Sequence, residues 1–220
     1  MNKKAKMWLA AAICLLAVFS AWTVALRLVD VQAIGPGDSE IGFAQLNRIF
    51  HKWTGVHMVL YHITDWLGLV PVGVGLGFAL LGMIQWIRRK HILRVDYSIL
   101  VLGGFYLAVM AVYILFEKIP VNYRPVLIDG VLEVSYPSST TMLVMCVMPT
   151  AVMQCKERIQ NAAVRRCVNT LLIAFTGFMV AGRLICGVHW LTDIIGGALV
   201  SGALVALYAF AAGMKIENRV

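Results

Sequence analysis

The stretch VAGRLICGVHWLTDIIGG, Val180–Gly197, joins two long apolar segments and carries Arg183, His189 and Asp193 at the junction. The rest of the chain is also apolar: of its 220 residues, 60% are hydrophobic and 14% are charged, and the mean hydropathy is +0.82. A soluble domain of this length needs many more charged residues to cover its surface. The composition therefore predicts an integral membrane protein, and the junction lies on one side of the bilayer.

Six apolar segments have the length of about 20 residues that crosses about 30 Å of hydrocarbon. Helices satisfy every backbone polar group within one segment, and these segments lack the alternating pattern of β-barrel strands. We therefore expect an all-α, polytopic protein with one membrane domain over residues 1–220. The six transmembrane helices are predicted at Met7–Leu26, Leu67–Ile87, Tyr97–Phe116, Ser138–Cys155, Val168–Gly182 with an extension toward Val188, and Trp190–Met214.

The first apolar segment follows Lys3, Lys4 and Lys6, an arrangement that also describes a secretory signal peptide. Its apolar run is about 20 residues long, whereas the core of a cleavable signal peptide usually has about 7–15. We therefore interpret the segment as an uncleaved first transmembrane helix.

Basic residues are distributed unequally between the two sides of the predicted bundle. Thirteen of the 19 Lys and Arg residues fall on one side. By the positive-inside rule, that side and both termini are cytoplasmic, and the Val180–Gly197 junction is extracytoplasmic. The net charge of +8 then reflects topology in a multi-pass cell-membrane protein, and we expect no nucleic-acid partner. The thirteen residues are Lys3, Lys4, Lys6, Arg88, Arg89, Lys90, Arg94, Lys156, Arg158, Arg165, Arg166, Lys215 and Arg219.

The polar residues of the junction have a spacing that suits chemistry. His189 and Asp193 are four residues apart, so on a helix they share one face. A carboxylate in that position can accept an imidazole N–H, fix the tautomer and leave the other ring nitrogen as a nucleophile. Arg183 lies six residues before His189, near the end of the preceding helix.

The connection that precedes the fourth predicted helix supplies further phosphate-binding groups. Lys118 and Arg124 are an ammonium and a planar guanidinium, both suited to phosphate oxygens. Pro137 and Ser138 open the helix, where free backbone N–H groups and the helix dipole favour an anion. Together with His189, these groups predict a phosphate site that contains a nucleophile.

Three motifs resemble the signature of the type 2 phosphatidic acid phosphatase (PAP2) family, which shares its core with vanadium haloperoxidases. That signature consists of Lys-x6-Arg-Pro, Pro-Ser-Gly-His and Ser-Arg-x5-His-x3-Asp, in this order. The third motif appears as GRLICGVHWLTD, Gly182–Asp193, with Gly182 in place of Ser. The first appears as KIPVNYRP, Lys118–Pro125, one residue shorter between Lys and Arg, and the second as PSST, Pro137–Thr140. The resemblance covers about residues 97–214 and implies a PAP2-like helical core.

The resemblance also implies the reaction and the roles of the residues. His189 would attack phosphorus and form a phosphohistidine, with Asp193 orienting the ring. The substrate would be a phosphorylated lipid, and the reaction would need neither a metal nor another cofactor. The phosphate-binding residues implied by the motifs are Lys118, Arg124, Arg183, Ser138 and Ser139.

The second motif departs from the family at its catalytic end. Family members have a histidine that protonates the leaving oxygen, and here this position is Thr140. A hydroxyl is too weak an acid for this role, and loss of general acid catalysis typically reduces a rate by about 10²–10⁴-fold. Three interpretations follow: another residue is the acid, the leaving group needs little help, or the chain binds without turnover. Substitute acids in the sequence are Asp129, Glu133, Tyr136 and the histidines of the first outer loop.

The outer loop over residues 28–66 is the longest polar stretch of the chain. From Ile41 onward its apolar residues have helical spacing, which predicts an interfacial helix over the phosphate site. His51, His57 and His62 do not share one helix face, so we expect no metal site there.

The predicted activity is hydrolysis of a lipid phosphomonoester or pyrophosphate at the extracytoplasmic face. Phosphatidic acid, phosphatidylglycerol phosphate, a polyprenyl pyrophosphate and phosphorylated lipid A all fit the sequence. The alternative is a binding or transport protein with a degenerate phosphatase site, in which Thr140 marks the loss of catalysis. A haloperoxidase fits less well, because those relatives are soluble.

Overall fold

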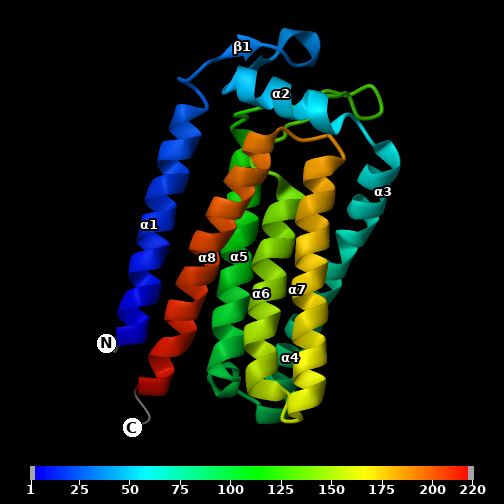
Figure 1. Ribbon diagram of the computed structural model, residues 1–220. Coiled ribbons are helices and arrows are strands. Elements are labelled where there is room, and N and C mark those ends of the chain that lie inside the picture. Colours follow the sequence, from blue (N-terminus) through cyan, green and yellow to red (C-terminus); the bar gives the residue numbers. More distant parts are fainter. Residues whose placement is uncertain (1–2, 218–220) are drawn as a thin grey trace.

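The structure is a computed structural model that describes residues 3–217, with side chains described as far as Gly213. Long helices run side by side as one bundle, and short elements lie across one end of it (Figure 1). The bundle helices are α1 (Lys3–Ala25), α3 (Met58–Leu67), α4 (Leu69–Arg89), α5 (Tyr97–Lys118), α6 (Ser139–Arg158), α7 (Ala162–Ile185) and α8 (Leu191–Glu217). The short elements are β1 (Gln32–Ala33), η1 (Pro36–Asp38), β2 (Glu40–Ile41), α2 (Ala44–Thr54) and η2 (Ile92–Arg94).

Five segments of the described chain are long and apolar enough to cross a membrane, which confirms the all-helical, multi-pass prediction in its coarse form. The remaining predicted span, Ser138–Cys155, corresponds to α6, which is 20 residues long but does not reach that apolarity. α6 packs against α4, α5, α7 and α8, so other helices cover much of its surface. Its buried Gln154 donates a hydrogen bond to Tyr208 Oη over 2.6 Å. Such a helix needs fewer apolar residues than one that faces lipid. The five segments are Lys3–Ala25, Met58–Arg89, Tyr97–Lys118, Ala162–Ile185 and Leu191–Gly213.

The second predicted span began too late in the sequence. Helix starts at Met58 rather than Leu67, and α3 continues past Gly68 into α4 to give a 32-residue apolar segment. The predicted outer loop therefore contains a helix that belongs to the bundle. Polar residues such as Thr64 and Asp65 lower the hydropathy of α3, yet Tyr61 and Thr64 are buried. α3 packs against α7, and this contact brings its polar residues to the functional end of the bundle.

The amphipathic helix predicted from Ile41 onward is α2, which lies across the end of the bundle (Figure 1). Asn47 on α2 is fully buried and fastens this helix to the first turn of α8. Its amide donates to Gly42 O over 2.9 Å and to Thr192 Oγ1 over 3.0 Å, and it accepts from the Thr192 backbone N–H over 3.3 Å. α2 is therefore held directly above the residue that precedes Asp193.

The described ends of the chain lie together at the end of the bundle opposite α2 (Figure 1). The α4–α5 and α6–α7 connections, which carry Arg88–Arg94 and Lys156–Arg166, lie at this end as well. Arg219, counted with the inner residues, lies outside the described residues. The structure thus separates the basic end of the bundle from the α2 end, and the membrane face that each end occupies remains a prediction.

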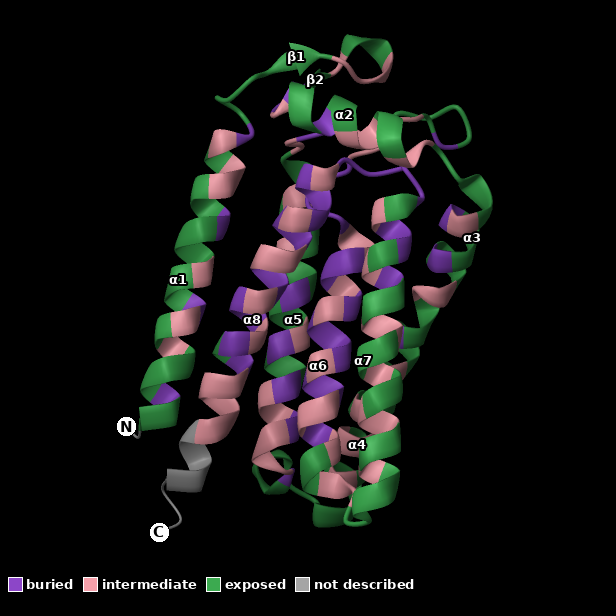
Figure 2. Ribbon diagram, viewed as in Figure 1, coloured by how far each residue is buried: buried purple, intermediate pink, exposed green. Residues whose placement is uncertain are grey.

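The buried core lies between the helices and not around them (Figure 2). Leu102 of α5, Met142 and Cys146 of α6 and Val200 of α8 belong to its largest cluster. Large apolar side chains on the outside of the bundle, such as Ile173 of α7, are exposed. In a bilayer these exposed side chains contact lipid, so the bundle is apolar both inside and outside.

Candidate active site

The end of the bundle under α2 brings together the last turn of α7, the α7–α8 connection and the first turn of α8. Arg183, His189 and Asp193 come from these three places in order. All three side chains are buried. Gly187, in the connection, has φ +71°, and a Cβ built there would lie 1.8 Å from Gly55 O. The α7–α8 connection therefore packs directly on the chain between α2 and α3.

A hydrogen bond between Arg183 and His189 determines the tautomer of the imidazole. Arg183 Nη2 donates to His189 Nε2 over 3.3 Å. A guanidinium has no acceptor, so Nε2 must present its lone pair and the ring proton must lie on Nδ1. The nitrogen that faces the arginine is thus the unprotonated one, as a nucleophile requires.

The surroundings of His189 also keep its ring neutral. Burial lowers the pKa of His189 well below its ordinary value, and the positive charges of Arg183 and Arg124 lower it further. Each effect disfavours the imidazolium form, because it removes water or adds a like charge. At neutral pH the imidazole is uncharged, and Nε2 keeps the lone pair that accepts the Arg183 N–H.

Asp193 faces the protonated side of the imidazole without a hydrogen bond to it. Asp193 Oδ2 lies 3.8 Å from His189 Nδ1, beyond hydrogen-bond range, so the direct tether expected from the spacing is not formed. The carboxylate instead accepts Asn122 Nδ2–H over 3.0 Å and the Trp190 backbone N–H over 3.0 Å. Asn122 was overlooked in the sequence, although it lies inside the first motif. It holds Asp193 in place from the α5–α6 connection.

Both arginines of the site lie against the same aromatic ring, that of Tyr61. The guanidinium carbons of Arg124 and Arg183 are 5.7 and 5.0 Å from the centroid of the Tyr61 ring. Arg124 forms an ion pair with Glu133 over 2.9 Å, and Arg183 lies 3.7 Å from Asp65. Cation–π contacts with Tyr61 place the two like charges near each other.

Some donors of these arginines are not used within the protein. Arg124 Nη1 and Arg183 Nε are buried and have no hydrogen-bond partner among the described residues. Buried N–H groups are normally satisfied, and an exception calls for an explanation such as a bound anion. The arrangement therefore suits a phosphoryl group beside His189.

The structure brings only part of the predicted phosphate site together. Ser138 is the N-cap of α6, its Oγ accepts the Thr141 N–H over 3.5 Å, and its own N–H donates to Asp193 O over 3.1 Å. Ser139 follows it and lines a cavity with His189. Thr140 is half-buried and is not among the residues that line this cavity. Lys118 is exposed at the end of α5, and no hydrogen bond or ion pair joins it to the other described residues.

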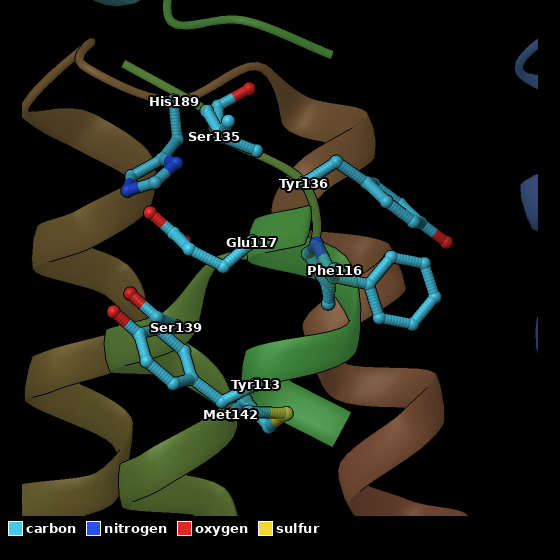
Figure 3. Close-up of a pocket in the computed structure, with 10 residues that line it drawn as sticks. Tyr113, Phe116, Glu117, Ser135, Tyr136, Ser139, Met142 and His189 are labelled. Carbon is cyan, nitrogen blue, oxygen red and sulfur yellow. The ribbon is translucent and has the colours of Figure 1, made fainter. Parts of the chain in front are cut away.

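The cavity beside His189 measures about 20 Å³ and contains an acidic residue that the sequence analysis missed (Figure 3). The side chain of Glu117 points from α5 toward the His189 ring. Seven positions before Arg124, where the family signature has Lys, this chain has Glu117. Reading the motif with the exact family spacing would have identified it. The lining residues are Tyr113, Phe116, Glu117, Val134, Ser135, Tyr136, Pro137, Ser139, Met142 and His189.

The protein is thus a helical membrane bundle with a neutral histidine and two arginines at one end. Residues 120–216 match the family model described as the PAP2 superfamily, which confirms the resemblance drawn from the three motifs. This matched part contains Arg124, Arg183, His189 and Asp193.

A solved structure has the same fold. It is the crystal structure of a transmembrane PAP2-type phosphatidylglycerolphosphate phosphatase from Bacillus subtilis, and it shares 18% identity with this chain at a TM-score of 0.55. The match covers 96% of this chain and 97% of that one. The comparison with curated proteins gives no significant match.

The replacement of the family serine by Gly182 has a packing cause. A Cβ built on Gly182 would lie 2.6 Å from Thr64 Cγ2 on α3. Thr64 also accepts a hydrogen bond from Arg183 Nη1 over 3.4 Å. The close approach of α3 to α7 therefore favours glycine at position 182. The same approach brings the Thr64 hydroxyl within hydrogen-bond distance of Arg183.

We predict that Gly182→Ser lowers the free energy of unfolding by about 1–3 kcal/mol, because the new side chain overpacks the contact with Thr64. Thr64→Ser removes the opposing methyl group and keeps the hydroxyl, so the double variant should recover most of the loss. Thermal unfolding in detergent measures both effects.

Gly177→Ala on the same helix is the matched control, because no atom lies within 4 Å of a Cβ built there. It should unfold close to the wild-type temperature. Wild-type stability of Gly182→Ser would show that α3 does not pack on α7 in this way.

Proposed function

We propose that this protein is a lipid phosphatase that forms a phosphohistidine on His189. The observation that carries the proposal is the contact between the unprotonated Nε2 of His189 and the buried guanidinium of Arg183. A phosphoryl group bound by Arg183 would lie next to the lone pair that attacks it. The PAP2 match and the fold shared with a membrane phosphatase support the same reaction class.

The proposed reaction has two steps. Nε2 attacks phosphorus, and the bond from phosphorus to the lipid oxygen breaks. Arg124 and Arg183 donate N–H groups to the phosphoryl oxygens and stabilise the charge of the transition state. The phosphorylated imidazole carries a positive charge, and Asp193, 3.8 Å from Nδ1, stabilises it. Water then attacks phosphorus and releases inorganic phosphate from the histidine.

In the proposed reaction the guanidinium groups of Arg124 and Arg183 stabilise the charge on the phosphoryl oxygens, and no step uses a metal ion. Among the described residues, no group of three or more His, Cys, Asp or Glu side chains is placed to hold a metal. The arginines, rather than a metal, are the electrophilic partners of the phosphoryl oxygens.

The proposed substrate is a membrane lipid that carries a phosphomonoester or a pyrophosphate. The apolar exterior of the bundle supports a lipid, because lipids surround a protein that is embedded in the bilayer. Phosphatidylglycerol phosphate belongs to this class, and it is the substrate in the name of the structurally similar protein. The second candidate function is lipid-phosphate binding without turnover, which the replacement of the family histidine by Thr140 favours.

We predict that purified wild-type protein releases phosphate from at least one lipid of a panel containing monophosphates and pyrophosphates. His189→Ala should reduce this activity by at least about 10³-fold, because it removes the nucleophile. Phosphate release from detergent micelles, with melting temperature as a check on folding, is the measurement.

His57→Ala is the matched control, since the His57 side chain is exposed and its hydrogen bond among the described residues is to the Thr54 carbonyl, over 2.8 Å. It should retain wild-type activity. Lipid binding by the wild type without any phosphate release would instead support the binding protein.

We further propose that the α2 end of the bundle is extracytoplasmic, on the strength of the 13 basic residues assigned to the other side. Asp129 is exposed at a turn of the α5–α6 connection, so it is a suitable position for labelling. Asp129→Cys should react with a membrane-impermeant maleimide in intact cells, in a background where the five native cysteines are replaced. Labelling only after lysis would reverse the topology.

A further inference from the structure

The proposed reaction leaves one chemical requirement without a residue. When the bond to an alkyl oxygen breaks, that oxygen needs a proton, and Thr140 does not supply it. The inference below rests on the proposed function and concerns the source of this proton. An acid that supplies this proton must line the cavity that contains His189.

Asp129, Glu133 and Tyr136 do not reach the cavity with an acidic group. Asp129 is exposed at a turn and does not line the cavity. Glu133 is held by Arg124 over 2.9 Å. Tyr136 lines the cavity with its ring, but its hydroxyl points away from His189 and forms a 2.7 Å hydrogen bond with Thr23 (Figure 3). Burial raises the pKa of Tyr136 as well, which makes it a still weaker acid.

The outer histidines are also occupied or distant. His51 Nε2 lies 3.1 Å from Gly187 O, and His57 Nε2 lies 2.8 Å from Thr54 O. His62 is exposed on α3 and its ring contacts Tyr61. None of the three lines the cavity that contains His189.

Glu117 is the one carboxyl group among the residues that line this cavity. It lies in the last turn of α5, one helical turn after Tyr113, which lines the same cavity. Its side chain points across the cavity toward the His189 ring (Figure 3). Glu117 and His189 thus line one cavity, and they form no ion pair with each other.

We propose that Glu117 is a catalytic residue that donates the proton to the leaving oxygen of the lipid. In the first step the N–P bond forms at His189 Nε2, the P–O bond to the lipid breaks, and the carboxyl proton of Glu117 moves to that oxygen. In the second step water attacks phosphorus, its proton moves to the Glu117 carboxylate, and the P–N electron pair returns to Nε2. The proton that Glu117 gives to the lipid oxygen in the first step is thus replaced from water in the second.

The position of Glu117 agrees with this role. General acid catalysis requires an acid within hydrogen-bond reach of the leaving oxygen, and Glu117 is the carboxyl group that lines the cavity with His189. Glu117 is exposed as well as lining the cavity, and it can therefore exchange protons with water between cycles. A lysine at this position would bind phosphate, and the glutamate replaces that function with proton transfer.

The test compares leaving groups in the first turnover of the full-length protein. Glu117→Gln keeps the shape of the side chain and removes its acidic proton. We expect it to slow alcohol release from a phosphomonoester lipid by about 10²–10⁴-fold. Release of polyprenyl monophosphate from a polyprenyl pyrophosphate should change little, because phosphate is a good leaving group without protonation. Rapid quenching measures both rates, each relative to the wild type.

The controls separate this proposal from the proposed function. Asp129→Asn removes an exposed carboxylate outside the cavity and should match the wild type on both substrates. If His189→Ala is inactive while Glu117→Gln keeps the wild-type rate on the monophosphate, the proposal for Glu117 fails and the phosphatase stands. Equal losses on both substrates would assign Glu117 a structural role and overturn the proposal. A wild type that hydrolyses only pyrophosphates would also contradict it.

Discussion

The hydrogen bond from Arg183 to Nε2 of His189 is the interaction on which the site depends. It forms between two buried groups that would both be costly to place in an apolar bundle without partners. Because the arginine can only donate, the contact fixes which imidazole nitrogen carries the lone pair. It also adds a positive charge that keeps the ring neutral. One interaction therefore determines the tautomer, the charge state and the place where a phosphoryl group would bind.

Several features of the fold keep this contact in place. α3 supplies Tyr61 to both arginines and Thr64 to Arg183, and Gly182 leaves the space for that approach. α2 is fastened to the first turn of α8 through Asn47. Asn122 holds the carboxylate of Asp193 from another connection. The site is thus built from side chains that are fixed by neighbours on different helices, as precise positioning requires.

The sequence predicts the parts of this site that depend on local spacing. Arg183, His189 and Asp193 meet because one helix ends and the next begins within a few residues, and the long apolar runs predict those helices. Contacts between segments that are distant in the sequence are harder to predict, and those of α3 are the main example. Its polar residues lower the hydropathy, but two of them, Tyr61 and Thr64, are buried and contact Arg183 inside the bundle.

Glu117 and Lys118 show how helix phase limits such predictions. Successive residues of a helix differ in direction by about 100°. Lys118 therefore faces outward where Glu117 faces the cavity, although the two are adjacent in the sequence. The choice between them depends on how α5 is rotated in the bundle, and packing against the other helices sets that rotation. Packing against other helices also explains α6. Because its neighbours cover much of its surface, it is less apolar than a helix that faces lipid.

The proposed reaction requires that His189 becomes covalently phosphorylated during turnover. The most direct measurement mixes the wild-type protein with a lipid pyrophosphate labelled in its terminal phosphoryl group and quenches the reaction with alkali within milliseconds. Alkali preserves phosphohistidine, and peptide mapping then locates the label. We expect label on His189 that appears before inorganic phosphate and decays as phosphate is released. Phosphate release at full rate with no label on His189, or with label on another residue, would contradict it.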